Sequence, residues 1–300
     1  MNIGVIGCGE LGSRMAKRLL LHDYNVFGYD CCQVALDNVA KLGVEPLKSP
    51  KEIASYCEVI ITCVTDQYAV EKCIMGENGV VYGLKENTIV IETTTSLPST
   101  TKKIGKAIRE LGADLIDAPV SRGIPAADNG TLSILVGGRP STLERSRAIL
   151  KVLGTDIIHC GELGAGHAVK AINMMMMACN LLTTTEIVLL GERSGLSLVT
   201  ILEELNRNSG ENYMTSHHFP KYVLTNSYQS NFSFELMYKD LNIAIKMADD
   251  MNLSLLMGQR CAHIYKLLST NVLGSDNMQS VKEIQKWMGD KYVQKVTTAK

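Results

Sequence analysis

The sequence predicts an α/β chain in which a doubly wound parallel sheet is followed by an all-helical domain. Three observations support this prediction. In the first half, short apolar runs alternate with helical patterns, which is typical of a parallel sheet covered by helices. A glycine-rich turn joins the first apolar run to the first helical pattern. In the second half the strand pattern fades and helical periodicity continues. We therefore predict two domains, residues 1–162 and 163–300, joined by a long helix.

The composition excludes several classes of protein. The 300 residues are 46% hydrophobic and 20% charged, enough apolar material for two cores. A net charge of -1 provides no broad attraction to nucleic acid or to an anionic membrane, and we expect neither partner. The first residues do not resemble a secretory signal, and the nine cysteines show no C-x-x-C spacing. We expect a cytoplasmic protein with reduced thiols and no metal site.

The N-terminal element is a strand, a glycine turn and a helix. The apolar run Ile3 to Ile6 leads into Gly7-Cys8-Gly9-Glu10-Leu11-Gly12, and apolar residues then recur at helical spacing. Gly7 permits the tight turn, Gly9 lets the backbone approach a pyrophosphate, and Gly12 lets the helix pack on the strand. The amides at the helix start, including those of Glu10 and Leu11, can hold the anion. This context predicts a Rossmann-type dinucleotide site.

A second strand, Asn25 to Asp30, ends in a carboxylate eighteen positions after Gly12. A carboxylate at this place accepts hydrogen bonds from the adenosine ribose and repels a 2′-phosphate. The sequence therefore favours NAD over NADP. The alternative is that Asp30 only forms an Asx turn before Cys31.

Further strands are predicted at Val59–Val64, Ile89–Glu92, Leu115–Ala118, Ser133–Val136 and Ile157–His159. Helices are predicted around Lys51–Tyr56, Ser99–Leu111 and Ser141–Leu153. Two of these strands end in polar clusters, Thr62–Asp66 and Glu92–Pro98. Ligands of doubly wound sheets bind at the carboxyl ends of strands, so Val64, Thr65 and Thr95 are candidate cofactor contacts. Thr94 and Thr95 could instead cap the helix that begins near Ser99.

The longest apolar run, from Leu163 to about Gly191, contains one lysine, Lys170. One interpretation is that its stem reaches along the helix so that the ammonium stays in water. The other is a desolvated lysine that exchanges protons, since burial lowers the pKa of an ammonium from its reference value of about 10.4. The polar residues near it, such as Asn173, argue against a membrane span.

The remaining residues predict further helices and a polar final segment. The helices are expected at Leu198–Asn206, Phe219–Leu224, Leu236–Met251 and Leu255–Thr270. The final segment contains Trp287, and we expect frayed chain past Lys291.

Four blocks of the sequence resemble the β-hydroxyacid dehydrogenase family, which includes 3-hydroxyisobutyrate dehydrogenase, tartronate semialdehyde reductase and, more remotely, 6-phosphogluconate dehydrogenase. The blocks span nearly the whole chain in the family's order. They are Gly7-x-Gly9-x-x-Gly12, Asp117-Ala118-Pro119-Val120-Ser121-Arg122-Gly123 with Gly130-Thr131-Leu132, Gly164-x-Gly166-x-x-x-Lys170-x-x-Asn173, and Lys239-Asp240-Leu241 with Phe232 upstream.

The resemblance implies a role for each matching residue. Lys170 is the acid/base, Ser121 and Gly123 hold a substrate carboxylate, and Asn173 orients the substrate. Cofactor contacts are implied for Thr95, Phe232 and Lys239. The resemblance also implies a homodimer or homotetramer joined through the helical domain. The expected substrate is a small anionic 3-hydroxy acid or its semialdehyde.

The chain departs from the family at Arg122, where many members have glycine, and at Met174, where many have asparagine. Arg122 could point to solvent or pair with an anionic group. An arginine here resembles the sulfolactaldehyde reductases, so a sulfonate or a second acidic group is an alternative anchor. A third hypothesis is a non-catalytic dinucleotide-binding module. The presence of Lys170, Ser121 and Asn173 together disfavours it.

Overall fold

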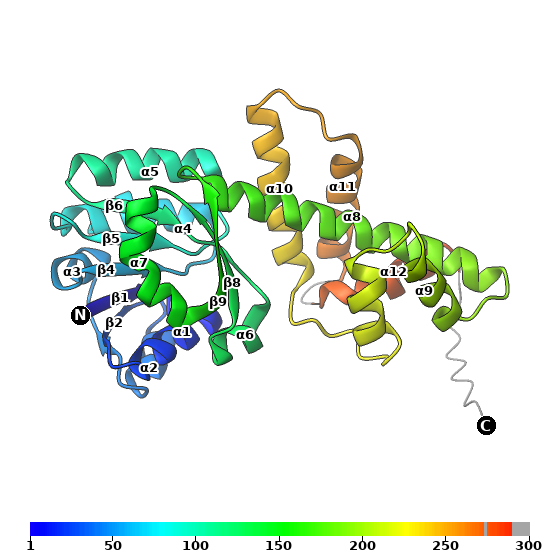
Figure 1. Ribbon diagram of the computed structural model, residues 1–300, viewed down its shortest axis with the longest axis horizontal. Helices are drawn as coiled ribbons and strands as arrows, with labels where there is room; N and C mark the ends of the chain where they lie inside the picture. Colours follow the sequence, from blue (N-terminus) through cyan, green and yellow to red (C-terminus); the bar gives the residue numbers. More distant parts are fainter. Residues whose placement is uncertain (273–274, 290–300) are drawn as a thin grey trace. The chain divides into compact units, whose positions relative to one another are not determined.

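The computed structural model describes residues 1–272 and 275–289. The chain divides into two compact units, Met1–Ala171 and Ile172–Lys300 (Figure 1). The division falls inside the long helix α8, Ala165–Arg193. The sequence predicts the boundary at residue 162, and the first unit ends nine residues later, at Ala171. The chain past Lys291, for which we expected fraying, lies outside the described residues.

The first unit is built on one nine-stranded sheet with the order β3-β2-β1-β4-β5-β6-β8-β7, and β9 pairs with β8. Strands β1 to β6 are parallel, which confirms the predicted doubly wound sheet, and the strand order reverses direction between β1 and β4. β8 runs antiparallel to β6 and β7. The strands are β1 Asn2–Ile6, β2 Asn25–Tyr29, β3 Glu45–Pro46, β4 Val59–Thr62, β5 Ile89–Glu92, β6 Asp114–Asp117, β7 Val120–Ser121, β8 Leu132–Gly137 and β9 Gly154–Gly161.

Helices follow most strands of this unit. They are α1 Glu10–Leu20, α2 Gln33–Ala40, α3 Pro50–Tyr56, α4 Gln67–Met75, the 3₁₀ turn η1 Val80–Tyr82, α5 Pro98–Glu110, α6 Gly123–Asn129 and α7 Pro140–Leu153. The sequence patterns predict the helices α1, α3, α5 and α7. They predict no helix at α2, α4 or α6 and no strand at β3 or β7.

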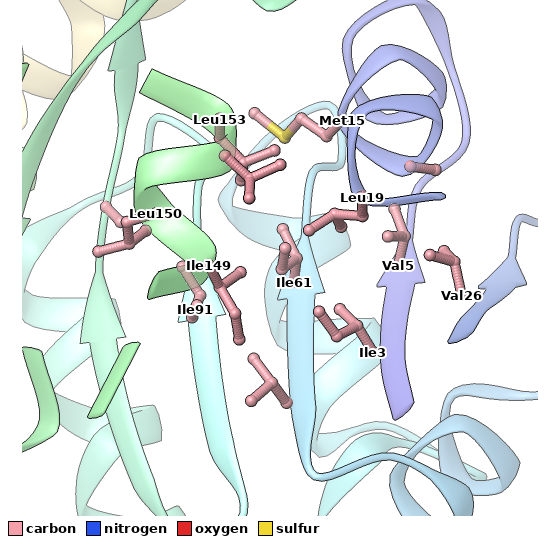
Figure 2. Packing of buried hydrophobic residues seen from close by; sticks show 14 of the residues in the cluster. Ile3, Val5, Met15, Leu19, Val26, Ile61, Ile91, Ile149, Leu150 and Leu153 are labelled. Atoms are coloured by element: carbon pink, nitrogen blue, oxygen red, sulfur yellow. The ribbon is translucent and has the colours of Figure 1, made fainter. Parts of the chain in front are cut away.

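Apolar side chains fill the space between this sheet and the helices on each of its faces. Figure 2 shows Met15 and Leu19 of α1 with Ile149 and Leu153 of α7, packed on Ile61 and other strand residues. A second cluster on the other face joins α3, α4 and α5 to the same strands. Because both faces are covered, the central strands read as continuous apolar runs. This packing holds the carboxyl ends of the strands in fixed positions.

The described part of the second unit is helical, as predicted. After α8 come α9 Leu198–Arg207, η2 Met214–Val223, α10 Phe234–Asp250, α11 Leu256–Asn271, η3 Asn277–Gln279 and α12 Ser280–Trp287. The segment predicted as a helix at Phe219–Leu224 is the second part of a π-helix that contains Pro220. Proline removes a backbone donor and disturbs the α pattern, which accounts for the difference.

Within the described residues, α8 is the one helix whose length and apolar composition would allow it to cross a membrane. About 44% of its most apolar stretch is buried in the protein. Lys170 lies near its start and is itself buried. The absence of a membrane partner stays a prediction.

Candidate active site

The glycine turn between β1 and α1 has the geometry that the motif requires. Gly7 has a φ of 94°, and a Cβ there would overlap the carbonyl oxygen of Cys63. A Cβ at Gly12 would overlap the Gly7 carbonyl, so α1 can approach the turn only with glycine. Gly9 differs, because a Cβ on it would meet nothing within 4 Å. The backbone at Gly9 therefore borders open space, as a site for a phosphate requires.

Glu10 and Leu11 form the first turn of α1, whose N-cap is Gly9. Glu10 pairs with Arg14 at 2.8 Å, and the Leu11 side chain packs on the core. No side chain caps this helix. The amides of its first turn are therefore available to an anionic group, and the helix dipole favours that charge.

Asp30 follows β2 and is fixed by two backbone donors. The Cys8 N–H donates to Oδ2 at 2.7 Å, and the Cys32 N–H donates to Oδ1 at 2.8 Å. The second contact is the Asx turn considered from the sequence, and the first ties the carboxylate to the glycine turn. Asp30 also borders a cavity of about 560 Å³, a size suited to part of a dinucleotide. The cavity is lined by Tyr29, Asp30, Cys31, Gln33, Leu36, Pro46, Leu47 and Lys48.

The polar clusters after β4 and β5 meet through Thr94. Its hydroxyl accepts a hydrogen bond from the Val64 N–H at 3.0 Å. The N-cap of α5 is Leu97, and no side chain caps that helix, so the capping alternative for Thr94 and Thr95 is wrong. Thr65 is exposed and contacts Asp66, and Thr95 is half-buried. Cofactor contacts by Val64, Thr65 and Thr95 stay predictions.

Lys170 is buried, with an exposed fraction of 8%. Its Nζ donates to the Val120 carbonyl at 3.0 Å and to the Ser121 hydroxyl at 3.1 Å, both on β7. The structure therefore brings together the amine and the hydroxyl that the family blocks supply from distant parts of the sequence. The interpretation of a solvated lysine does not fit this burial. An amine and a hydroxyl in contact can serve one bound oxyacid, the first in proton exchange and the second as an anchor.

The first residues of α8 are hydrogen-bonded to Asp117, the last residue of β6. Asp117 Oδ1 accepts from the Gly164 N–H at 2.7 Å, and Oδ2 accepts from the His167 N–H at 2.8 Å. Gly164 has a φ of 94°. A Cβ at Gly166 would overlap the Leu135 carbonyl and lie 2.8 Å from Asp117 Oδ2. The two glycines before the lysine thus allow the helix to begin directly against the sheet.

The His167 side chain is fully buried beside two carboxylates. Its Nε2 lies 3.1 Å from Glu92 Oε2, and its Nδ1 lies 3.8 Å from Asp117 Oδ2 and 2.8 Å from Thr101 Oγ1. Burial by itself lowers the pKa of this imidazole, but the charges of Glu92 and Asp117 and the hydrogen bonds to the ring outweigh it and raise the pKa above its ordinary value. No sequence pattern predicts a role for His167, and Glu92 is predicted only as the first residue of the polar cluster Glu92–Pro98.

Arg122 and Gly123 both have left-handed backbones, with φ of 83° and 69°. The Arg122 guanidinium donates to the Thr131 carbonyl at 3.1 Å and pairs with Asp156 on β9. Both partners of this ion pair are partly exposed. A Cβ on Gly123 would meet nothing within 4 Å, so its backbone borders open space. Substrate contacts of these two residues stay predictions.

Three predicted residues belong to the second unit. Asn173 is exposed on α8, and Lys239 lies on α10 with its Nζ 3.3 Å from Asp240 Oδ1. Phe232 precedes α10, and its N–H faces Asp276 Oδ2 at 3.3 Å. Their roles toward substrate and cofactor stay predictions. Within the described residues, no group of three His, Cys, Asp or Glu side chains is arranged to hold a metal ion. All nine cysteines are free.

Two family models match the chain. Residues 2–161 match the NAD-binding domain of 6-phosphogluconate dehydrogenase. Residues 164–284 match a domain described as the NAD-binding domain of NADP-dependent 3-hydroxyisobutyrate dehydrogenase. The two matches meet next to residue 162.

Full-length relatives agree with the models. The chain is 31% identical over 288 residues to 2-(hydroxymethyl)glutarate dehydrogenase of Eubacterium barkeri, covering 96% of each chain. It is 32% identical over 272 residues to an NAD-dependent L-serine dehydrogenase of Pseudomonas aeruginosa, covering 89% of this chain and 91% of the relative. A structure of Mycobacterium tuberculosis 3-hydroxyisobutyrate dehydrogenase with L-serine superposes with a TM-score of 0.90 at 27% identity, covering 95% and 99% of the two chains.

Proposed function

The chain belongs to the β-hydroxyacid dehydrogenase family, and we propose that it interconverts a 3-hydroxy carboxylate and its semialdehyde with Lys170 as the acid/base. Membership makes it an NAD-dependent oxidoreductase acting on a CH–OH group, which sets aside the non-catalytic module. The single observation that carries the proposal is the contact of the buried Lys170 amine with Ser121 at 3.1 Å.

The cofactor fits the residues of the first unit. Open space beside Gly9, uncapped amides at the start of α1 and the fixed carboxylate of Asp30 match the needs of a pyrophosphate and a ribose. We propose NAD rather than NADP, because Asp30 would repel a 2′-phosphate. When bound, the nicotinamide ring supplies or accepts the hydride.

The protein's own part is to hold the hydroxy acid and to move one proton. In the oxidation direction, neutral Lys170 takes the hydroxyl proton at Nζ as the carbonyl forms. In the reduction direction, the ammonium returns that proton to the carbonyl oxygen. The Ser121 hydroxyl and the backbone amide of Gly123 would hold the carboxylate, so that the reacting carbon stays beside the amine. Low exposure at Lys170 keeps bulk water from competing for the proton.

The named substrates of the relatives share one chemical frame. Serine, 3-hydroxyisobutyrate and 2-(hydroxymethyl)glutarate are all HOCH₂–CHR–COO⁻ and differ in the substituent R, which is ammonium, methyl or carboxyethyl. We propose this frame as the substrate class, with the 3-hydroxyisobutyrate type as the first candidate. Selectivity among these substrates then depends on how the site accommodates the substituent R.

A second candidate is a substrate with a second acidic group, either a carboxylate as in the glutarate or a sulfonate. The observation in its favour is the position of Arg122 next to Ser121. Its guanidinium now pairs with Asp156, so it would have to exchange that partner for the substrate. Kinetics with each R group, for wild type and Arg122→Gln, would decide. A selective loss for diacid or sulfonate substrates supports the second candidate, and equal kcat/KM ratios support the first.

The main experiment replaces Lys170 by alanine. We expect kcat to fall by about 10²- to 10⁴-fold, the usual contribution of a positioned acid/base, while the Kd for NAD changes little. Lys106→Ala, at an exposed lysine on α5, is the matched control and should retain activity. Wild-type turnover in Lys170→Ala would contradict the proposed role.

We also propose a cytoplasmic homodimer or homotetramer without nucleic acid or membrane partners. The cytoplasmic location is inferred from the free state of the cysteines, and the assembly from the family resemblance. Light scattering of the purified chain and fractionation of cells that express it would test the two statements.

A further inference from the structure

Two acidic residues lie side by side in the interior of the first unit. Glu92 ends β5 and Asp117 ends β6, and the two are register partners in the parallel sheet. Their exposed fractions are 1% and 0%. Neighbouring like charges on adjacent strands repel one another, and burial increases the cost. Hydrogen-bond donors and a neighbouring cation can compensate such a pair.

His167 supplies that compensation from the first turn of α8. Its Nε2 lies 3.1 Å from Glu92 Oε2, and Nδ1 lies 2.8 Å from Thr101 Oγ1. The Thr101 hydroxyl also lies 3.1 Å from the Leu97 carbonyl, which can only accept. The hydroxyl proton therefore points to that carbonyl, and Nδ1 is a donor. Nε2 lies at ion-pair distance from a carboxylate, and the negative charges of Glu92 and Asp117 favour the protonated, charged form of the ring.

The cluster Glu92–His167–Asp117 is joined to Lys170 by the backbone of α8. Asp117 accepts the Gly164 and His167 N–H groups, which have no partner within the helix. Lys170 follows His167 by three residues, so both lie on the same side of the helix. The amine is then held by Val120 and Ser121, which follow Asp117 closely in the chain. The segment from Asp117 to Ser121 therefore holds both the first residues of α8 and the amine of Lys170.

Fold stability alone gives no reason for this arrangement. Buried ion clusters can often be replaced by apolar groups of similar volume without loss of stability. A polar cluster with directed contacts, however, fixes the rotation and depth of the helix start more narrowly than apolar packing does. A misplacement of about 1 Å at a reacting group can cost about 100-fold in rate.

We propose that Glu92, His167 and Asp117 are positioning residues, which set the place of the Lys170 amine through the first turn of α8. The inference rests on the proposed role of Lys170. None of the three needs to touch the substrate. Their loss should therefore lower kcat and leave substrate and cofactor binding nearly intact.

The test is His167→Gln, which keeps a donor and much of the volume but removes the cation. We expect kcat to fall by about 10- to 100-fold, while KM for the hydroxy acid and Kd for NAD change by less than about 3-fold. The matched control is His159→Gln. His159 bonds the Gly138 carbonyl at 2.8 Å outside the cluster, and its replacement should leave kcat within about 2-fold.

A purely structural role would give a different result. In that case His167→Gln would lower the melting temperature and keep the wild-type kcat in the folded protein, and this outcome overturns the inference. If His167→Gln does not fold, Thr101→Val removes only the hydroxyl facing Nδ1. We expect a kcat lowered by about 3- to 10-fold with KM unchanged, since the hydrogen bond that orients the ring through Nδ1 is lost. An unchanged kcat in that variant also overturns it.

Lys170→Ala separates this inference from the proposed function. If Lys170→Ala remains active, the proposed function fails and the inference fails with it. If Lys170→Ala is inactive while His167→Gln and Thr101→Val keep full kcat, only the positioning role fails.

Discussion

Lys170 Nζ lies 3.1 Å from Ser121 Oγ, although the two residues are separated by 49 positions in the chain. The hydroxyl belongs to a two-residue strand and the amine to the second turn of a long helix. Their contact places the proposed anchor for the acid and the proposed proton-exchanging group in one small volume. Several measurable consequences follow from this site and from the sheet that supports it.

Ser121→Ala removes the hydroxyl and leaves the Val120 carbonyl as a partner of the amine. We expect KM for the hydroxy acid to rise by about 10-fold, since a hydrogen bond to a charged group contributes about 1.5 to 3 kcal/mol. The Kd for NAD should not change. Ser55→Ala on α3, where the hydroxyl only bonds the Glu52 carbonyl, is the control. An unchanged KM would show that Ser121 does not hold the substrate.

Gly9 and Gly12 should respond to alanine in opposite ways. Gly9→Ala adds a methyl group in open space, so stability should stay the same while NAD binds about 10-fold more weakly, or ~1.4 kcal/mol. Gly12→Ala forces a methyl group into the Gly7 carbonyl and should destabilise the fold by about 1 to 3 kcal/mol. Calorimetry of binding and thermal melting would measure both. Loss of stability in Gly9→Ala would contradict the assignment.

Asp30→Ser should relax cofactor discrimination. Removing the carboxylate ends the repulsion of a 2′-phosphate and weakens the hold on the NAD ribose, so the ratio of kcat/KM for NAD over NADP should fall by about 10- to 100-fold. Asp37→Ser on α2, where the carboxylate only contacts Gln33, should leave the ratio unchanged. A ratio that does not move in Asp30→Ser would remove the basis for preferring NAD.

The raised pKa of His167 predicts a pH dependence of stability. A group whose pKa is higher in the folded protein stabilises fully below its unfolded value of about 6.5, and this contribution is lost as pH rises through the folded value. The charged groups facing the ring are Glu92 and Asp117, with Lys170 one turn further along α8. Melting temperatures measured from pH 6 to 8.5 should therefore decline in wild type.

Glu92→Gln tests the origin of that decline, because Glu92 gives the largest of the effects that raise the pKa of His167. The decline should become smaller in Glu92→Gln and disappear in His167→Gln. An NMR titration of the ring would follow the same proton directly. A wild-type slope in both variants would assign the pH dependence to other groups.

The central strands could be predicted from the sequence, whereas the short elements could not. β4 and β5 are buried along their whole length, and such strands appear as unbroken apolar runs. β3 and β7 have two residues each, too few to show a period. α6 contains Gly123 and Pro125, which read as turn residues. Asp66 caps α4, but its place in the polar cluster Thr62–Asp66 also fits a ligand site, so the sequence alone does not separate the two roles.

The site residues that belong to a sequence motif could be predicted from the sequence. The spacing of the glycines predicts the dinucleotide turn, and the family resemblance implies roles for Lys170 and Ser121, which lie in contact. The Glu92–His167–Asp117 cluster was not found, because the pairing of Glu92 with Asp117 depends on strand register, which no local pattern shows. A usable signal was present in two acidic strand ends and a histidine one turn before the lysine. The partner of Arg122, Asp156, likewise depends on the pairing of β8 with β9.

Arg122 occupies a left-handed backbone position that glycine adopts at no steric cost, whereas a residue with a Cβ loses about 1 to 2 kcal/mol there. A glycine at this position would avoid this penalty. The Arg122 backbone is therefore strained, while its guanidinium is held by the Thr131 carbonyl and by Asp156. Replacing Arg122 by glycine would remove the backbone strain and the cation together.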